Sequence, residues 1–226
     1  MDIPDALTSA GAGMRLQTER LDVIADNLAN AGTVAYRARR WIGRAFGERL
    51  ESATASSSAQ GTLRRTDVPT DMALIGDGYF TVMTPQGTRY TRDGRFSPNG
   101  RGGLADAQGN PVLGMRGSAR LPRGARVEAD GTIVAGGRVV DRLRIVSADG
   151  HPEADGPDQV AQTSTRLSAS HAVVRSGYLE ESGVDPIAEM TALVSSQRAF
   201  EANQKALQRA DEALKRAVTE VPSVRS

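Results

Sequence analysis

Residues 7–31 read LTSAGAGMRLQTERLDVIADNLANA, and this stretch decides the fold of one end of the chain. Apolar residues recur in it at alternating steps of three and four, with the polar Gln17 at one expected position. This spacing is typical of a heptad seam on an amphipathic helix. Pro4 suits the first turn of such a helix, and Asn30 and Gly32 supply a stop signal. The segment therefore predicts a helix with one narrow apolar face.

The other end of the chain repeats this pattern from Pro186 to about Val221. Large residues occupy one heptad position: Leu193, Phe200, Leu207 and Leu214. Smaller residues occupy the neighbouring seam position: Ser196, Asn203, Ala210 and Ala217. Small residues opposite large ones permit close approach of helices. The two seams suit packing of the helices within one monomer, packing between monomers, or both.

Between the helical ends, pairs of a polar residue and a glycine punctuate short apolar runs. These pairs are Asp77-Gly78, Gln86-Gly87, Asp93-Gly94, Asn99-Gly100, Gln108-Gly109, Asp130-Gly131 and Asp149-Gly150. Such pairs accept the positive φ angles of tight hairpin turns. The middle of the chain is therefore predicted to be a β-meander, with strands such as those at residues 79–83, 95–97 and 143–146.

These patterns together predict a discontinuous α+β fold in which the two ends of the chain meet. Residues 1–40 and 177–226 are expected to form a coiled-coil-like helical domain, and residues 61–176 a mainly antiparallel β-domain inserted between them. Residues 51–60 are rich in serine and alanine without strong periodicity. Residues 41–60 are therefore predicted to be a flexible arm or linker.

Composition excludes several classes of partner. The 226 residues include 28 basic and 27 acidic side chains, so the net field offers no general attraction for nucleic acids or anionic membranes. The absence of cysteine excludes disulfides, thiolate metal sites and cysteine nucleophiles. No run approaches the roughly 18 apolar residues of a membrane-spanning helix, and no cleaved secretory signal is visible. We expect no nucleic-acid partner and no membrane insertion.

The chain is also poor in reactive constellations. Its two histidines, His151 and His171, do not stand at metal-ligand spacing from one another. Gly76-Asp77-Gly78 precedes an expected strand and opens no helix, which indicates a turn and not a phosphate loop. The sequence therefore predicts a protein that is not an enzyme, with no catalytic residues, no metal and no cofactor. Paired carboxylates acting on a glycan stay open, because their separation depends on the tertiary structure.

Three stretches in one order resemble the flagellar rod and hook proteins. The first is residues 20–37, RLDVIADNLANAGTVAYR, and the second combines residues 71–80, DMALIGDGYF, with residues 89–96, RYTRDGRF, and residues 109–114, GNPVLG. The third combines residues 176–185, SGYLEESGVD, with residues 197–203, QRAFEAN. Three departures stand out: Ala35 replaces the family's usual glycine, Asp26 a common asparagine, and Gly183 a usual asparagine.

This resemblance implies a structural subunit of the flagellar basal-body rod that assembles helically and transmits motor torque to hook and filament. The implied partners are copies of itself, other rod and hook-junction axial proteins, and the flagellar export apparatus. The implied location is the periplasm-spanning rod, reached without signal cleavage. Residues 138–146 slightly favour the proximal rod type, while the C-terminal helix is equally similar to the distal one. The alternatives are a rod-associated binding or cap module and, less favoured, a periplasmic glycan hydrolase.

The seams and the shared motifs together define a candidate assembly interface. Its polar members are candidates for hydrogen bonds between subunits that set the register, as polar seam residues do in coiled coils. The predicted interface residues are Leu7, Met14, Leu21, Ile24, Asn27, Leu28, Asn30, Tyr36, Leu193, Gln197, Phe200, Asn203, Leu207 and Leu214.

Overall fold

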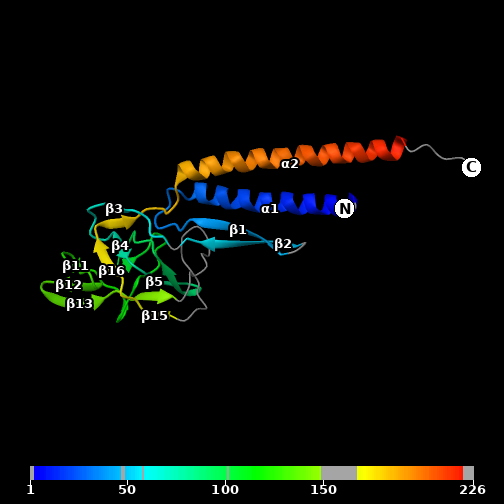
Figure 1. Ribbon diagram of the computed structural model, residues 1–226. Coiled ribbons are helices and arrows are strands. Elements are labelled where there is room, and N and C mark those ends of the chain that lie inside the picture. The colour runs from blue at the N-terminus through cyan, green and yellow to red at the C-terminus, as the bar shows by residue number, and fades with distance from the viewer. Residues whose placement is uncertain (1–2, 47–48, 58, 101, 149–166, 221–226) are drawn as a thin grey trace, which may run out of the picture. The chain divides into compact units, whose positions relative to one another are not determined.

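The computed structural model describes residues 3–46, 49–57, 59–100, 102–148 and 167–220 (Figure 1). The chain divides into two compact units. The helical unit comprises Met1–Ala29, Arg39–Ala55 and Asp185–Ser226, and the β-rich unit comprises Asn30–Ala38 and Ser56–Val184. The mix of helices with a mainly β unit confirms the α+β class. The unit boundaries differ from the predicted ones, because residues 30–38 and 177–184 cluster with the β-rich unit.

Two long helices dominate the helical unit. Helix α1 spans Ile3–Ala29 (27 residues) and α2 spans Pro186–Glu220 (35 residues). They run antiparallel and side by side (Figure 1). Asp185 caps α2, because its Oδ1 accepts hydrogen bonds from the backbone N–H groups of Ile187 (3.0 Å) and Ala188 (3.2 Å). Pro186 occupies the first helical position, where no N–H is needed.

Two strands of the helical unit lie in the segment predicted to be an arm or linker. Strands β1 (Arg39–Phe46) and β2 (Arg49–Ser56) form a two-stranded sheet. Pairing of this kind uses backbone groups, so a Ser/Ala-rich strand such as β2 forms it without an apolar run in the sequence. The local structure thus differs from the expected irregular chain, while a linker role for residues 41–60 stays a prediction.

The β-rich unit contains several small sheets, and every pairing described within it is antiparallel. The four-stranded sheet has the order β15 (Leu167–Ala169), β14 (Ile145–Ala148), β5 (Tyr79–Thr84) and β6 (Gly87–Thr91). The three-stranded sheet has the order β11 (Arg126–Val127), β12 (Thr132–Ala135) and β13 (Arg138–Arg142). The two-stranded sheets are β16 (Val173–Ser176) with β4 (Met72–Ile75), β17 (Tyr178–Glu180) with β3 (Leu63–Arg65), β7 (Ser97–Pro98) with β8 (Leu104–Ala105), and β9 (Leu113–Gly114) with β10 (Gly117–Ser118).

This topology corrects the predicted β-meander. The hairpins β5–β6 and β12–β13 join strands that are neighbours in the sequence, as expected. However, β14 pairs with β5, β16 with β4, and β17 with β3, so the later strands return to the earlier ones. Turn signals report local hairpins only, and therefore they did not indicate these long-range pairings.

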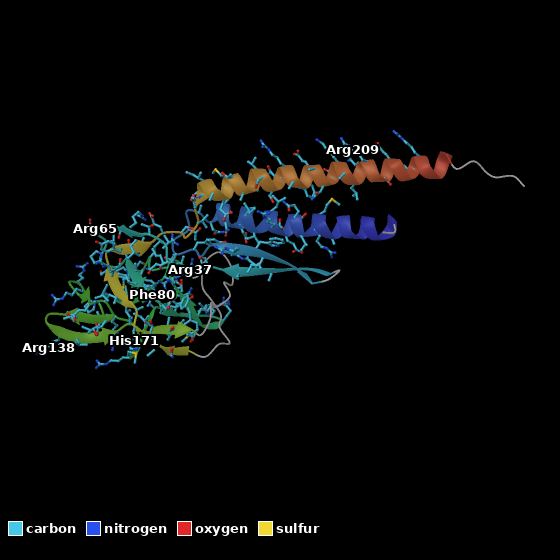
Figure 2. All side chains as sticks on the ribbon, viewed as in Figure 1. Arg37, Arg65, Phe80, Arg138, His171 and Arg209 are labelled. Atoms are coloured by element: carbon cyan, nitrogen blue, oxygen red, sulfur yellow. The ribbon has the colours of Figure 1, made fainter. Side chains whose placement is uncertain are left out.

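One hydrophobic core holds the β-rich unit together. Phe80 and Phe96 meet edge to face with ring centroids 5.0 Å apart, and Phe80 is fully buried. Figure 2 labels Phe80 among the strands of the β-rich unit. Gly94 permits a close backbone approach beside this pair, since a Cβ there would lie 1.5 Å from the carbonyl oxygen of Met72. The other members of the core are Met72, Leu74, Val82, Leu104, Val112, Ala119, Ile133, Leu143 and Val174.

Candidate assembly site

The seams of α1 and α2 face each other within the helical unit. The Nε2 amide of Gln17 donates hydrogen bonds to the carbonyl oxygen of Ser196 (3.0 Å) and to its hydroxyl. The polar break in the first seam is therefore matched by a small polar residue in the second. Within one monomer α1 and α2 thus lie side by side and are joined at this point. Coiled-coil packing of the two seams on each other stays a prediction.

The predicted interface residues differ in how much of their side chain is accessible. Those that are partly buried are Met14, Leu21, Leu28, Asn30, Leu193, Phe200 and Leu207, and those that are exposed are Gln197 and Asn203. Those that are buried are Ile24, Asn27 and Tyr36. The side chains of Leu7 and Leu214 lie outside the described part of the chain. Whether any of these residues contacts another subunit stays a prediction.

Asn27 has a role within the chain that the sequence did not indicate. Its Nδ2 donates to the carbonyl oxygen of Arg39 (2.8 Å) and to Oε1 of Glu189 (2.7 Å), and its Oδ1 accepts from the N–H of Arg39 (2.8 Å). These bonds join α1, β1 and α2 within the helical unit. Asn27 is only 1% exposed and its amide is bonded inside the chain. A hydrogen bond from Asn27 to another subunit stays a prediction.

The sequence reasoning missed an exposed apolar stripe at the start of α2. Ile187, Met190 and Val194 are 77%, 53% and 48% exposed. They follow the spacing i, i+3, i+7, so they share one face of the helix, and this face differs from that of Leu193 and Phe200. Their spacing could have revealed them, but the longer seam on the same helix accounted for the visible periodicity. We call these three residues the α2 stripe.

A buried charged cluster fixes the chain inside the β-rich unit. Nε of Arg92 lies 2.9 Å from Oε2 of Glu180, and their side chains are 3% and 2% exposed. The remaining Arg92 donors reach the carbonyl oxygens of Gly76 (3.0 Å), Gly78 (2.8 Å) and Leu74 (3.1 Å). A buried ion pair is tolerated when further hydrogen bonds satisfy both partners. Here β4 and the segment between β4 and β5 supply the carbonyl groups for Arg92, and the N–H of Gly61 donates to Oε1 of Glu180 (3.2 Å).

Arg37, which Figure 2 labels, lies in the segment that follows α1 in the sequence. It belongs to the same cluster through its contact with Glu180. Its guanidinium lies 3.8 Å from Oε1 of Glu180 and donates to the carbonyl oxygen of Ala59 (2.8 Å). Burial lowers the pKa of Arg37 and the charge of Arg92 lowers it further, whereas Glu180 raises it. Burial also raises the pKa of the neighbouring Tyr79. Arginine stays protonated in proteins, so the cluster keeps two cations around one carboxylate.

Backbone hydrogen bonds tie the segments on either side of this cluster to each other. The N–H of Ala35 donates to the carbonyl oxygen of Glu180 (2.8 Å), and the N–H of Gly183 donates to that of Tyr36 (2.8 Å). The segment that follows α1 in the sequence is thus joined to the segment that precedes α2. We call this set of contacts, together with Arg37, Arg92 and Glu180, the connector junction.

Ala35 holds a strained conformation within the junction. Its φ is +58°, in the left-handed region that favours glycine, and its side chain is 1% exposed. The shared motif carries glycine at this position. Ala35 therefore adopts a backbone conformation that suits glycine, and it does so with backbone strain. A left-handed alanine costs about 1–2 kcal/mol.

Replacing Ala35 with glycine is therefore expected to raise the free energy of unfolding of the β-rich unit by about 1 kcal/mol, less the entropy that glycine loses on folding. Replacement with valine is expected to lower it by more than about 2 kcal/mol, because a β-branched residue tolerates this φ poorly and has no room. Urea denaturation of the three chains checks both signs. Equal stability of the glycine and valine variants would contradict the account.

The described residues offer little for catalysis. No group of histidine and carboxylate side chains among them is arranged to hold a metal ion. His171 is exposed, and His151 lies outside the described residues. In the portion of the chain that the structure covers, neither helix is both long enough and apolar enough to cross a membrane.

Comparison with known proteins identifies the family. Residues 7–37 match the family model described as flagella basal body rod protein, residues 73–140 match the flagellar hook protein FlgE/F/G D1 domain, and residues 175–220 match the flagellar basal body rod FlgEFG protein C-terminal model. The three matches place the chain in the class of flagellar rod and hook proteins.

Individual relatives cover nearly the whole chain. The flagellar basal-body rod protein FlgF of Mesorhizobium japonicum is 35% identical over 93% of this chain and 97% of its own length. FlgF of Rhizobium meliloti is 35% identical over 86% of this chain and 88% of its own length. The rod protein FlgG of Caulobacter vibrioides is 30% identical over 92% of this chain and 96% of its own length.

The chain belongs to the flagellar basal-body rod protein family. It is a structural subunit of the rod, part of the basal body, and not an enzyme. The resemblance read from the sequence motifs is thereby confirmed.

Proposed function

We propose that this subunit assembles, through its helical unit, with copies of itself and with other rod and hook-junction axial proteins around the rod axis. The observation that carries the proposal is the α2 stripe, whose three apolar side chains are 48–77% exposed. Apolar side chains this exposed and this regularly spaced are usually covered by a partner helix. Helices from neighbouring subunits would bury the stripe in a coiled-coil-like contact.

The connector junction supports a role in transmitting torque. Force carried along the segments next to α1 and α2 in the sequence would reach residues held by the buried Arg92–Glu180 pair. An anchor of this kind yields less than a solvent-exposed loop, because opening it would leave charges uncompensated in the interior. In the same proposal, the subunit leaves through the flagellar export apparatus without signal cleavage and occupies the periplasm-spanning rod.

A double substitution on the α2 stripe tests the assembly role. The variant Ile187→Asp/Met190→Asp is expected to abolish rod completion and motility, because it places two carboxylates in an apolar contact. Its monomer should unfold at the denaturant concentration of the wild type, since both residues are exposed. Soft-agar swimming and electron microscopy of isolated basal bodies measure the outcome.

The matched control is Ala199→Asp/Ala202→Asp, which has the same spacing and charge change on another exposed face of α2. This control should swim normally. Wild-type swimming by the Ile187→Asp/Met190→Asp strain would refute the proposed use of the stripe.

A further inference from the structure

The turn between β9 and β10 carries an exposed methionine on the β-rich unit. Met115 is 69% exposed, although its N–H is fixed by a hydrogen bond to the carbonyl oxygen of Arg142 (2.8 Å). Val139, on β13, is 63% exposed. The strand pairing sets Val139 opposite Val134 and Arg142 opposite Thr132, which places Val139 and Arg142 on the same face of the three-stranded sheet. The side chains of Met115 and Val139 are thus exposed to solvent, although the backbone of each is fixed by hydrogen bonding or strand pairing.

Three arginines lie beside these two residues, next to them in the sequence or across the backbone pairing. Nη1 of Arg116 lies 3.4 Å from the carbonyl oxygen of Val140, and the N–H of Arg144 donates to the carbonyl oxygen of Leu113 (3.0 Å). Arg116 and Arg144 are exposed, and no ion pair links either of them to another described residue. Arg142 makes a long contact with Asp130 (3.8 Å). We call Met115, Val139, Arg116, Arg142 and Arg144 the Met115 surface.

The composition of this surface indicates a protein partner that carries negative charge. Methionine and arginine are enriched in protein interfaces, where an apolar centre with a polar rim is the usual arrangement. The unpaired guanidinium groups add a preference for carboxylates, with which arginine forms bidentate hydrogen bonds. Elsewhere in the β-rich unit, the exposed carboxylates of Asp67 and Glu181 and the partly buried carboxylate of Asp93 already have arginine partners.

The chain itself contains a matching acidic run. Residues 149–158 read DGHPEADGPD, with four carboxylates and no lysine or arginine. The run lies outside the described residues, so only its charge enters the argument. In the sequence, the acidic run begins directly after the last residue of β14, whereas Arg144 stands directly before the first residue of β14. Basic and acidic features therefore attach to opposite ends of the same strand. Contacts between unlike surfaces of identical subunits are head-to-tail, and these generate helical filaments.

We propose that the Met115 surface of one subunit binds the acidic run, residues 149–158, of a neighbouring copy. The contact rests on the proposed rod assembly and adds to it a second, charge-dependent interface between β-rich units. It accounts for an apolar and cationic surface that the helical contacts leave unused. Its strength falls as salt rises, because exposed charges are screened over roughly 10 Å at 0.1 M ionic strength.

A charge-swap experiment on the full-length chain tests the proposal. Variant A carries Arg116→Glu and Arg144→Glu, and variant B carries Glu153→Arg and Asp155→Arg. Sedimentation velocity at low salt is expected to show that each variant alone associates at least about tenfold more weakly than the wild type, because like charges then face each other. An equal mixture of A and B should recover the lost association, since every contact again joins opposite charges.

Controls separate this inference from the proposed function. Arg64→Glu/Arg65→Glu makes the same charge change on β3 and should associate like the wild type. Unfolding midpoints of A and B matching the wild type would show that neither variant is misfolded. Failure of the mixture to recover, with wild-type association intact, overturns the Met115 contact and leaves helical assembly standing. A wild-type chain that never associates overturns both proposals. Both are also overturned if the mixture of A and B associates no more strongly than either variant alone and the Ile187→Asp/Met190→Asp strain swims normally.

Discussion

Replacing Glu180 with glutamine is expected to lower the free energy of unfolding of the β-rich unit by about 3–5 kcal/mol. Arg92 and Glu180 are almost fully buried, so neutralising the carboxylate leaves a guanidinium ion in the interior without its counter-charge. The second cation, Arg37, lies near the same carboxylate and adds to the loss. Urea denaturation of the full-length chain, followed by a signal from the β-rich unit, measures the change.

The next residue supplies the control. Glu181 pairs with Arg64 at 3.3 Å, but their side chains are about half exposed, at 47% and 54%. Glu181→Gln should therefore change stability by less than about 1 kcal/mol, as exposed ion pairs do. The double variant Arg92→Met/Glu180→Leu should lose less than the two single changes added together, because it removes the most deeply buried pair of charges as a unit and leaves only Arg37, whose side chain is 16% exposed, without its carboxylate. Similar losses for Glu180→Gln and Glu181→Gln would contradict the role of burial.

The second large effect is expected in the helical unit. Leu207→Asp should prevent rod assembly and abolish motility, since it places a carboxylate in the apolar seam of α2, where Leu207 is partly buried. Leu21→Asp should act in the same way on α1. The β-rich unit should keep its own unfolding transition, because its core draws no residue from either helix.

Gln208→Asp makes the same charge change on the neighbouring, exposed residue and should leave swimming unchanged. Electron microscopy of basal bodies isolated from each strain measures rod assembly, and an unfolding curve of each purified chain measures stability. Normal motility of the Leu207→Asp strain would show that the seam is not needed. Loss of the β-rich transition would show that the change acts on folding and not on assembly.

The helices were predictable because their signal is local and repeated. Both apolar seams and the first-turn Pro186 are visible in the sequence, and α2 begins at Pro186. The short strands were predictable for a similar reason, since a polar residue followed by glycine marks many of their turns. The interruption at Gln17 could be seen but not explained, because its partner, Ser196, is far away along the chain.

The connector junction could not be predicted from local pattern. Arg92 stands among charged and polar residues, as a surface arginine would, and its burial depends on β17 returning to pair with β3. The hydrogen bonds of Asn27 within the chain were not predicted for the same reason, because all three depend on where β1 and α2 lie. The α2 stripe was accessible to reasoning from spacing alone. It was missed because the longer seam on that helix explained the same periodicity.

The unequal lengths of the two helices give the subunit a direction. With Gln17 level with Ser196, the first residues of α1 lie level with about residue 210 of α2, so roughly the last three turns of α2 extend past the described start of α1 (Figure 1). A stack of such subunits offers a protruding helix end at one extremity and a recess at the other. Growth and capping are therefore expected to be chemically distinct events at the two extremities, and a molecule shaped to fill the recess would stop elongation there alone.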